Sequence, residues 1–443
     1  MKKKILSLLL TTALVMSALS GCGNASESTE AAKTETSDTT SESTSESTSE
    51  STSETAGDTI KIGVSGPTTG SSAEAGTHVN TGIQMAVDEV NANGGVTIDG
   101  EKKKVEVIYY DTGSDAQTGL SNCEKLITND KVDFLFCESF NSAVGIATME
   151  LAKKYEIPMA TLEPVSSAIS DKIVEDPESY KYFFKFGWDS SAYGETCAQT
   201  VLDLVEKGSI DAPNKTIAIC GDETDYGRSN LASVVEKMEE AGFSVVSENY
   251  WEFGSTDLYS IISDIKAKGA DVIFSCSTTP ATGVALIKQL AENGIGDVPH
   301  MAIFFPSQPE FTEQIGNQAD GLMWAPLLID VEHDEASKEF AEKLDAYCGE
   351  AITFDYIDGY SDTMVVLEAM EKCGSVDGAA LSEALLSEEG FDTYKGHIQF
   401  NPENHTIYHG AGFVEVKSAQ IQDGVNYQIF PEESAQAEYK PTK

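Results

Sequence analysis

The chain has 443 residues, and its 73 acidic side chains outnumber its 29 lysines and arginines to give a formal net charge of −44 at pH 7. This acidity argues against nucleic acid as a partner and against a polybasic attachment to anionic lipid. The part that follows the N-terminal segment is long enough for two lobes of ordinary domain size.

The first residues have the pattern of a secretory signal peptide. Lysines at positions 2–4 precede an apolar run over 5–19, which is too short to serve comfortably as a permanent membrane helix. The run ends in Leu-Ser-Gly-Cys, which resembles the lipobox of bacterial lipoproteins, where the cysteine is acylated and becomes the new N-terminus. We therefore expect a signal peptide over 1–22 and a lipid such as palmitate on Cys22. The alternative is an ordinary N-terminal helix with a chance cysteine.

Residues 23–57 contain almost nothing apolar, and 41–54 read SESTSESTSESTSE. Such a segment cannot bury enough surface to offset the entropy of ordering itself. We expect a disordered Ser/Thr/Glu tether that holds a folded body away from the membrane, although tolerated filler fits the same composition.

Strands and helices then alternate along the chain. The apolar periodicity predicts strands at 58–67, 105–110, 132–137 and 157–161, and helices at 82–91, 116–128 and 142–155. This alternation is typical of βαβ units and a parallel sheet.

The same plan restarts after residue 188. It predicts helices at 192–206, 229–241, 259–267 and 281–293, and strands at 216–220, 245–251, 271–277 and 301–305. Further helices are expected at 335–347, 360–372 and 379–386, strands at 397–400 and 412–416, and a disordered tail over 431–443. The fold class is therefore α/β, with two similar lobes, each a parallel sheet flanked by helices. A ligand would bind at the carboxyl ends of the strands, in a cleft between the lobes.

Several segments resemble the branched-chain (Leu/Ile/Val) amino-acid-binding proteins of ABC transporters, which have the type I periplasmic-binding fold. They are IKIGVSGPTTGSSAEAGTHVNTGIQMAVDEVNANGG at 60–95, YYDTGSDAQTGLSNCEKLITNDKVDFLF, GDETDYGRSN, FGSTDLYSIISDIKAKGADVIF and GHIQFNPENHT. The resemblance extends from residue 60 to about 430. It implies a hinge of three crossovers, with lobe one at 58–186 plus 327–400 and lobe two at 187–326 plus 401–430.

The resemblance also implies binding positions. The family holds a ligand carboxylate with a serine at a helix N-terminus, and Ser142 matches it, next to Asn141. A plain N-cap serine is the alternative. Glu163 stands in a loop where the family usually has a small residue, whereas Tyr226 matches a tyrosine that closes on the ligand from lobe two. Thr278 takes a position that is often aromatic.

One departure concerns the ligand's ammonium group. The acid that binds it in the family is not visible after the strand at 301–305, where the sequence has Phe305. Either Glu163 supplies the negative charge from the opposite side, or the ligand has no ammonium group. Phe304, Phe305 and Trp188 are candidates for an apolar or aromatic lining, and the alternative for each is a place in the core.

The sequence contains no GxSxG, GxxxxGK[ST] or HExxH motif and no Cys/His cluster at metal spacing. We expect no enzyme activity, no cofactor and no metal. The favoured function is a lipid-anchored receptor on the extracytoplasmic face of the cell membrane, which binds an amino acid or a similar small solute. Its partners would be the permease and ATPase subunits of an ABC importer. The alternative is a ligand-sensing module of the same fold with no transport role.

Overall fold

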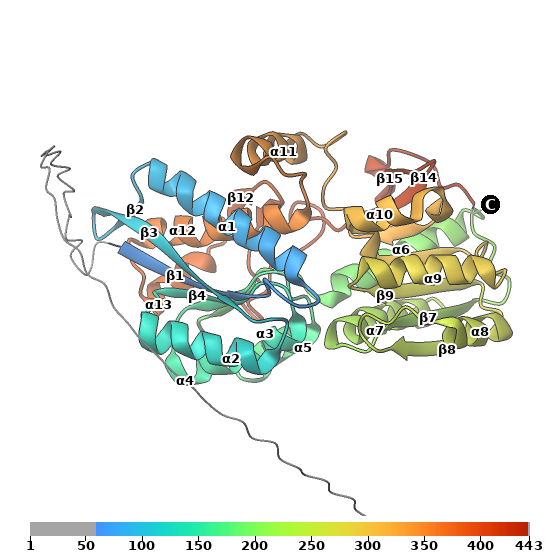
Figure 1. The fold of residues 1–443 in the computed structure, drawn as a ribbon, viewed down its shortest axis with the longest axis horizontal. Helices are drawn as coiled ribbons and strands as arrows, with labels where there is room; N and C mark the ends of the chain where they lie inside the picture. Colours follow the sequence, from blue (N-terminus) through green and yellow to red (C-terminus); the bar gives the residue numbers. More distant parts are fainter. Residues whose placement is uncertain (1–58, 442–443) are drawn as a thin grey trace, which may run out of the picture. The chain divides into compact units, whose positions relative to one another are not determined.

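The computed structural model describes residues 59–441 (Figure 1). The predicted signal peptide, Cys22 and the tether lie outside these residues. Within the described part, none of the helices combines the length and the apolar character needed to cross a bilayer.

The first sheet has six strands in the order β2-β3-β1-β4-β5-β6, and all neighbouring pairs are parallel except β2 with β3. Its strands are β1 (Thr59–Gly66), β2 (Val96–Ile98), β3 (Glu101–Asp111), β4 (Phe134–Glu138), β5 (Met159–Thr161) and β6 (Phe183–Lys185). The helices between them are α1 (Ala73–Ala92), α2 (Ala116–Lys125), α3 (Ser142–Thr148), α4 (Ala152–Tyr155) and α5 (Ser167–Glu175). We call this sheet and the helices that pack on it lobe one.

Strand β4 shows how side-chain alternation builds two cores. Phe134 and Phe136 belong to a buried cluster that includes residues of α1, whereas Leu135 and Cys137 belong to one that includes residues of α2. Successive strand residues point to opposite faces, so a continuous apolar strand needs helices on both sides. Figure 1 shows this layering, with α1 on one side of β1 and β4 and α2 on the other.

The second sheet has the order β15-β14-β11-β10-β9-β7-β8, with parallel pairs from β8 to β11 and antiparallel pairs at β14 and β15. Its strands are β7 (Thr216–Asp222), β8 (Ser244–Trp251), β9 (Val272–Ser277), β10 (His300–Phe304), β11 (Met323–Ala325), β14 (Ser418–Gln422) and β15 (Val425–Phe430). The helices are α6 (Ser190–Glu206), α7 (Asp225–Glu240), α8 (Tyr259–Lys268), α9 (Pro280–Glu292) and α10 (Pro309–Ile315). We call this sheet and its helices lobe two.

The chain then returns to lobe one as α11 (Glu335–Cys348), α12 (Phe354–Cys373), α13 (Gly378–Leu385) and the hairpin β12 (Phe391–Thr393) with β13 (Gly396–Ile398). Helix α12 packs closely on α1, and glycines make this approach possible. A Cβ on Gly82 would lie 2.3 Å from the Tyr356 carbonyl, and one on Gly359 would lie 2.2 Å from the Val79 carbonyl. The chain thus passes between the lobes three times, as predicted.

The predicted α/β architecture is confirmed, but some boundaries are wrong. Residues 401–409 belong with lobe one, because the backbone N–H of Lys185 donates to the carbonyl of His405, whose ring stacks on Phe184. The strand expected at 412–416 is absent from the described chain there except for an isolated bridge, and β14 and β15 follow it instead. Helix α12 starts at Phe354 and helix α1 starts at Ala73, earlier than the predicted starts at 360 and 82.

The end of the chain also differs from the prediction of a disordered tail. The Gln420 side chain donates to the carbonyl of Lys440 and accepts from its N–H, at 2.7 and 2.8 Å. Gln422 donates to the carbonyl of Glu438 at 2.8 Å. Two buried glutamines therefore hold the segment up to 441 against strand β14.

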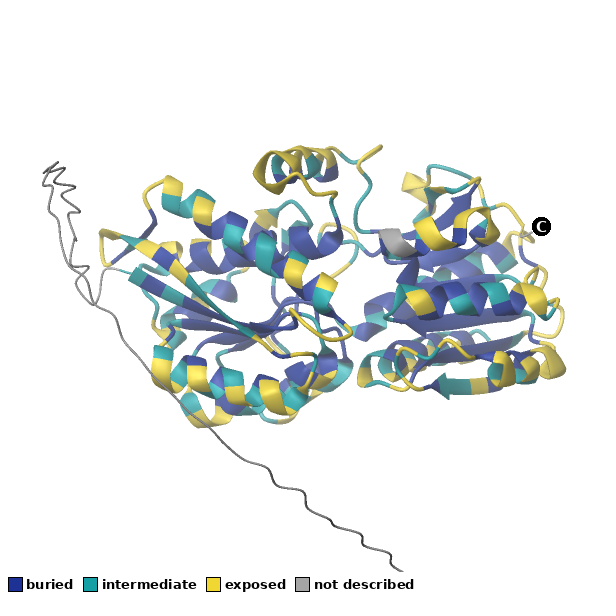
Figure 2. Cartoon of the chain, viewed as in Figure 1, coloured by how far each residue is buried: buried dark blue, intermediate teal, exposed yellow. Residues whose placement is uncertain are grey.

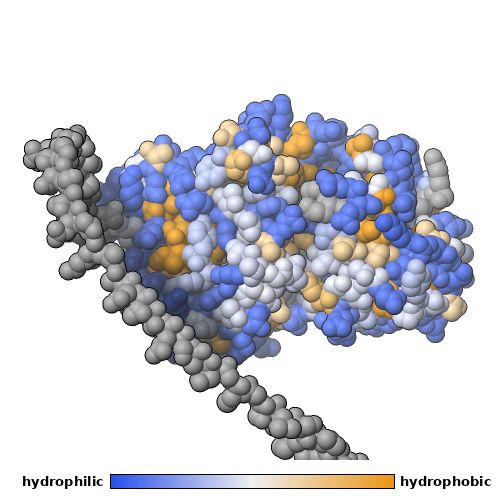
Figure 3. Space-filling view, viewed as in Figure 1, coloured by the Kyte–Doolittle hydropathy of each residue, from blue (hydrophilic) through white to orange (hydrophobic). Residues whose placement is uncertain are grey.

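Figure 2 shows that the central strands of both sheets, such as β4, β9 and β10, are buried, while β3 and the outward faces of the helices carry exposed residues. The exposed large apolar side chains of the described residues are few and scattered: Val174, Tyr259, Val331, Tyr347 and Val425. Figure 3 accordingly shows a face that is mostly hydrophilic, with apolar atoms in small separate areas.

Candidate functional site

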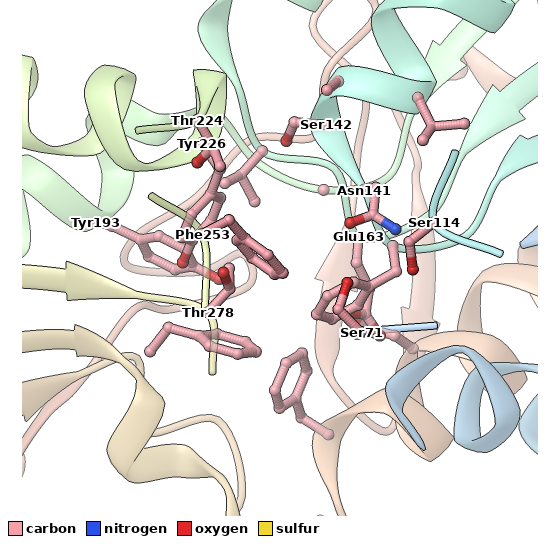
Figure 4. Close-up of a pocket in the computed structure, with 18 of the residues that line it drawn as sticks. Ser71, Ser114, Asn141, Ser142, Glu163, Tyr193, Thr224, Tyr226, Phe253 and Thr278 are labelled. Atoms are coloured by element: carbon pink, nitrogen blue, oxygen red, sulfur yellow. The ribbon is translucent and has the colours of Figure 1, made fainter. Parts of the chain in front are cut away.

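A cavity of about 200 Å³ lies where the strands of both sheets end. Lobe one contributes Ser71, Ser114, Phe140, Asn141, Ser142, Ala143, Val144, Glu163, Val165, Phe354 and Asp358; the crossover contributes Gly187 and Trp188; and lobe two contributes Tyr193, Thr224, Tyr226, Phe253, Thr278 and Phe304. Figure 4 shows Ser71, Ser114, Asn141 and Glu163 facing Tyr193, Tyr226, Phe253 and Thr278. The carboxyl ends of parallel strands are the usual ligand-binding edge of such sheets.

The loop after β4 is shaped by a buried carboxyl group. Oε1 of Glu138 accepts the backbone N–H groups of Phe140 and Asn141 at 3.0 and 2.9 Å, and burial raises the pKa of Glu138 to about 8. Helix α3 begins immediately afterwards at Ser142, as predicted, and Asn141 occupies the N-cap position. The Ser142 hydroxyl accepts the N–H of Ser166 at 3.3 Å, which leaves its proton for another acceptor. Nδ2 of Asn141 is buried without a partner.

The loop after β5 brings Glu163 to the cavity. Its N–H donates to the carbonyl of Ser139 at 3.1 Å, and its own carbonyl lies against Gly187, where a Cβ would approach to 2.8 Å. The Glu163 side chain is 9% exposed, and Oε1 has no hydrogen-bond partner. Burial, followed by the nearby charges of Asp355 and Asp358, raises the pKa of Glu163 well above its ordinary value.

A buried lysine holds this loop in place. Nζ of Lys185, at the end of β6, donates to the carbonyls of Val165 and Ser166, each at 3.0 Å, and lies 3.5 Å from a carboxylate oxygen of Asp189. Burial lowers the pKa of Lys185 to about 8, although Asp189 opposes the shift. Lys185 does not touch the cavity, so it is a positioning residue for the segment that carries Glu163.

A cluster of ionisable groups lies behind Glu163, on the return helix α12 and on the hairpin that follows it. Lys395 makes ion pairs with Asp358 at 3.1 Å and Asp362 at 2.6 Å, and all three side chains are almost fully buried. Asp355 accepts from the Thr353 hydroxyl at 2.6 Å and lies 3.3 Å from His78. Burial raises the pKa of Asp358, and Lys395 counteracts that effect.

On lobe two, Asp222 ties three strand ends together. One carboxylate oxygen accepts both the N–H and the hydroxyl of Thr278 at 2.7 Å, and the other accepts the indole N–H of Trp251 at 2.6 Å. The proton of the Thr278 hydroxyl is thus already used within the protein. By contrast, the buried hydroxyl of Tyr226 and the indole N–H of Trp188 have no partner.

Of the two phenylalanines named as candidates, Phe304 lines the cavity and Phe305 does not, so the prediction of Phe305 is wrong. In β10, the side chains of Met301 and Ile303 pack in one buried apolar cluster, and the side chain of Ala302 packs in another. Regular alternation along the strand would therefore place the side chain of residue 304 in the same cluster as Ala302. Phe304 instead has φ 77° and ψ −61°, a strained γ-turn conformation that turns its ring to the cavity side. Phe305 then packs on the face of α9, 5.0 Å from the ring of Phe311.

The other predicted residues all line the cavity: Asn141, Ser142, Glu163, Trp188, Tyr226 and Thr278. The sequence analysis missed Phe140, Tyr193, Phe253, Phe354 and Asp358. Phe253 could have been found from its position just after a parallel strand. Phe354 and Asp358 carry no local signal, because they reach the cavity from a helix that returns after the second sheet.

Two parallel sheets with a cavity of unpartnered polar groups between their carboxyl ends define a two-lobed solute-binding protein. The sequence model described as periplasmic binding protein matches residues 59–422, and the chain belongs to that family. It is a binding protein and not an enzyme, as predicted. Within the described residues, no three His, Cys, Asp or Glu side chains are placed to hold a metal ion.

Individual proteins are similar at low identity. A leucine-, isoleucine-, valine-, threonine- and alanine-binding protein of Pseudomonas aeruginosa is 25% identical over 343 residues, which cover 77% of this chain and 86% of the relative. A putative branched-chain amino acid ABC transporter structure from Silicibacter pomeroyi has a TM-score of 0.76 at 21% identity, covering 87% and 99%. A solute-binding protein from R. palustris, in complex with 4-hydroxybenzoate, has a TM-score of 0.68 at 22% identity, covering 83% and 95%. The predicted type I periplasmic-binding fold and family are confirmed.

Proposed function

We propose that this protein is the lipid-anchored solute-binding protein of an ABC importer, and that it binds an amino acid or a related small solute in the cavity between its lobes. The similarity to an amino-acid-binding protein and to ABC transporter solute-binding structures supports the class of solute. The cavity volume of about 200 Å³ restricts the occupant to a small molecule.

The observation that carries the proposal is the set of unpartnered polar atoms. Nδ2 of Asn141 and Oε1 of Glu163 come from lobe one, the hydroxyl of Tyr226 from lobe two, and Nε1 of Trp188 from the crossover between them. Buried polar atoms in proteins are almost always hydrogen-bonded, because leaving one unpaired costs about 1–3 kcal/mol. A polar solute that reaches all four would bind both lobes at once.

Contact with both lobes at once would also allow the protein to deliver its solute to the importer. A solute that contacts both sides stabilises the arrangement in which they are close together, by its differential affinity for that arrangement. The permease and ATPase subunits of the importer would recognise this state. The N-terminal pattern ending in Cys22, outside the described residues, would keep the protein at the membrane surface beside them.

A thermal-shift screen against amino acids, amides and aromatic acids tests the binding function. A solute that binds only the folded state at a hundred times its Kd adds about 2.7 kcal/mol to the free energy of unfolding, which raises the melting temperature measurably. If no solute raises the melting temperature, the proposed class of solute is wrong.

The membrane anchor needs its own test. Cells that express the full chain and are fed a labelled fatty acid should incorporate it into the wild-type protein and not into Cys22→Ser. Label on both proteins, or on neither, would contradict lipidation at this cysteine.

A further inference from the structure

We propose that the solute is an organic amine, whose ammonium group pairs with Glu163 and whose apolar body lies among the aromatic side chains of the cavity. This rests on the proposed function and narrows the class of solute. It also decides between a carboxylate-only solute and one that carries a positive charge.

The first argument is a charge imbalance around the cavity. Four carboxyl groups (Glu163, Asp355, Asp358 and Asp362) are buried on its lobe-one side, and the basic side chains that contact members of this set are the almost fully buried Lys395 and the partly exposed His78. Asp355 lies beside His78, and Lys395 is shared by the other two aspartates. No ion pair in the described residues joins Glu163 to a cation. Buried charges are normally paired, so a cation from outside the chain completes this set.

The second argument is the position of Glu163 itself. Its side chain is 91% buried, yet it lines the cavity, and Oε1 there has no partner. Glu138 differs in two ways: its Oε1 accepts two backbone N–H groups, and it does not line the cavity, whereas no hydrogen bond within the described residues reaches the carboxyl group of Glu163. The free oxygen of Glu163 is available to a ligand.

The third argument comes from what the cavity lacks. None of the described residues that line the cavity is lysine, arginine or histidine. Two acidic residues, Glu163 and Asp358, do line it. A solute with a carboxylate and no amine would meet these two acids without a cationic side chain to balance it. A buried charge needs an opposite charge to balance it, so this lining favours a solute that carries an amine over one that carries only a carboxylate.

The fourth argument is the aromatic wall. The Phe304 ring lies edge-on to three neighbours, with centroid distances of 6.1 Å to Phe140, 6.2 Å to Tyr226 and 5.6 Å to Phe354. Trp188 lies 5.5 Å from Tyr193 in the same geometry. Aromatic faces attract cations, and their rings pack against an apolar body. This wall suits an aliphatic or aromatic amine better than a highly polar solute.

Pairing with an ammonium group requires Glu163 to be ionised. In the empty cavity, burial favours its protonated form, and Asp355, Asp358 and Asp362 on α12 reinforce this, while Lys395 opposes it. Tyr193 on α6 interacts with Glu163 from the lobe-two side, and His78 on α1 lies beside Asp355. A cationic amine that arrives from solution therefore displaces a proton from Glu163 to water.

Matched solutes provide the test. Leucine, 3-methylbutylamine and 4-methylpentanoate share one body and differ in having both charged groups, only the amine or only the carboxylate. Phenylalanine, 2-phenylethylamine and 3-phenylpropanoate form the corresponding aromatic set. Calorimetric titration of the purified protein measures all six Kd values, and repetition in buffers of different ionisation enthalpy measures the proton released.

We expect an amine-bearing member of at least one set to bind, the two carboxylates to bind at least ten times more weakly, and binding to release a proton. Glu163→Gln keeps the shape and removes the charge, and should weaken the amine at least about 30-fold. Glu371→Gln is the control, because this substitution makes the same change in net charge away from the cavity. Glu371 lies at the surface on α12, with its carboxylate 3.0 Å from Nζ of Lys102. The affinity of Glu371→Gln for the amine should stay within twofold of that of the wild type.

A carboxylate that binds as tightly as its matched amine overturns this inference and leaves the proposed function intact. The same holds if Glu163→Gln binds the amine as the wild type does. If no solute binds, either here or in the thermal-shift screen, both proposals fail. Should Glu163→Gln not fold, the wild-type comparison of matched solutes still decides the question.

Discussion

Replacing Tyr226 with phenylalanine isolates one unpartnered group. The Tyr226 hydroxyl is buried at the cavity without a hydrogen-bond partner, so replacing it leaves no other group in the protein unpaired. The free energy of unfolding without solute should stay the same or rise by up to about 1 kcal/mol, because an unpaired polar group leaves the interior. Affinity should fall, because the solute loses a neutral hydrogen bond worth about 0.5–1.5 kcal/mol, which corresponds to about 2- to 12-fold in Kd.

Tyr109→Phe is the matched control. Its hydroxyl, on β3, donates to the Asn80 carbonyl at 3.2 Å and lies 3.3 Å from the Gln84 side-chain oxygen, so both contacts serve the fold. This variant should lose about 1 kcal/mol of stability and keep its affinity.

Urea denaturation without solute and calorimetry with the tightest-binding matched solute provide the two readouts. The reasoning predicts opposite results: Tyr226→Phe changes affinity and not stability, and Tyr109→Phe does the reverse. If Tyr226→Phe loses stability and keeps its affinity, its hydroxyl serves the fold, and unpartnered atoms do not mark the binding site.

Three further predictions follow from the same geometry. Phe305→Ala should lower the free energy of unfolding, measured by urea denaturation, by about 3–5 kcal/mol and change the affinity for the amine by less than twofold. Phe304→Ala should weaken amine binding at least tenfold. Equal affinities for the two variants would contradict the placement of these two side chains. Lys185→Met should cost about 3–5 kcal/mol, because it removes the cation beside the mostly buried carboxylate of Asp189 and leaves two loop carbonyls without their donor; a loss below 1 kcal/mol by the same assay would contradict a positioning role. Amine affinity should fall as the pH is lowered through the raised pKa of Glu163, by up to tenfold per pH unit, because only the ionised carboxylate pairs with the ammonium group; calorimetry between pH 5 and 9 that shows no such fall, or a rise, would contradict that pairing.

Much of the fold could be predicted because its strands are apolar and regularly separated by amphipathic helices. The predicted strand at 132–137 and helix at 142–155 match β4 and the helical segments that follow it. Errors arose where tertiary contacts override local pattern. The first turns of α1 are rich in polar residues, yet Val79 is buried because α12 packs there.

The candidate site could be predicted in part, for a topological reason. Ser142, Glu163 and Thr278 follow parallel strands, and the ends of such strands converge on one edge. The sequence offered both Phe304 and Phe305 and could not decide between them, because a single positive φ at Phe304 reverses the alternation of the strand. Asp358 could not be predicted, because it lies far along the chain from the strands whose ends it faces.

The same limit applies to the end of the chain. Residues 431–441 are polar and lack periodicity, and the partners that order them are the side chains of Gln420 and Gln422 on a strand that was also missed. Side-chain hydrogen bonds to an irregular backbone leave no periodic trace in a sequence.

The most direct measurement is a crystal structure of the protein with the tightest-binding amine of the matched sets. The account predicts that the solute occupies the cavity between the lobes, with its nitrogen within about 2.7–3.2 Å of a Glu163 carboxylate oxygen and its body against Phe304. A solute bound elsewhere, or bound with its nitrogen directed away from Glu163, would contradict it.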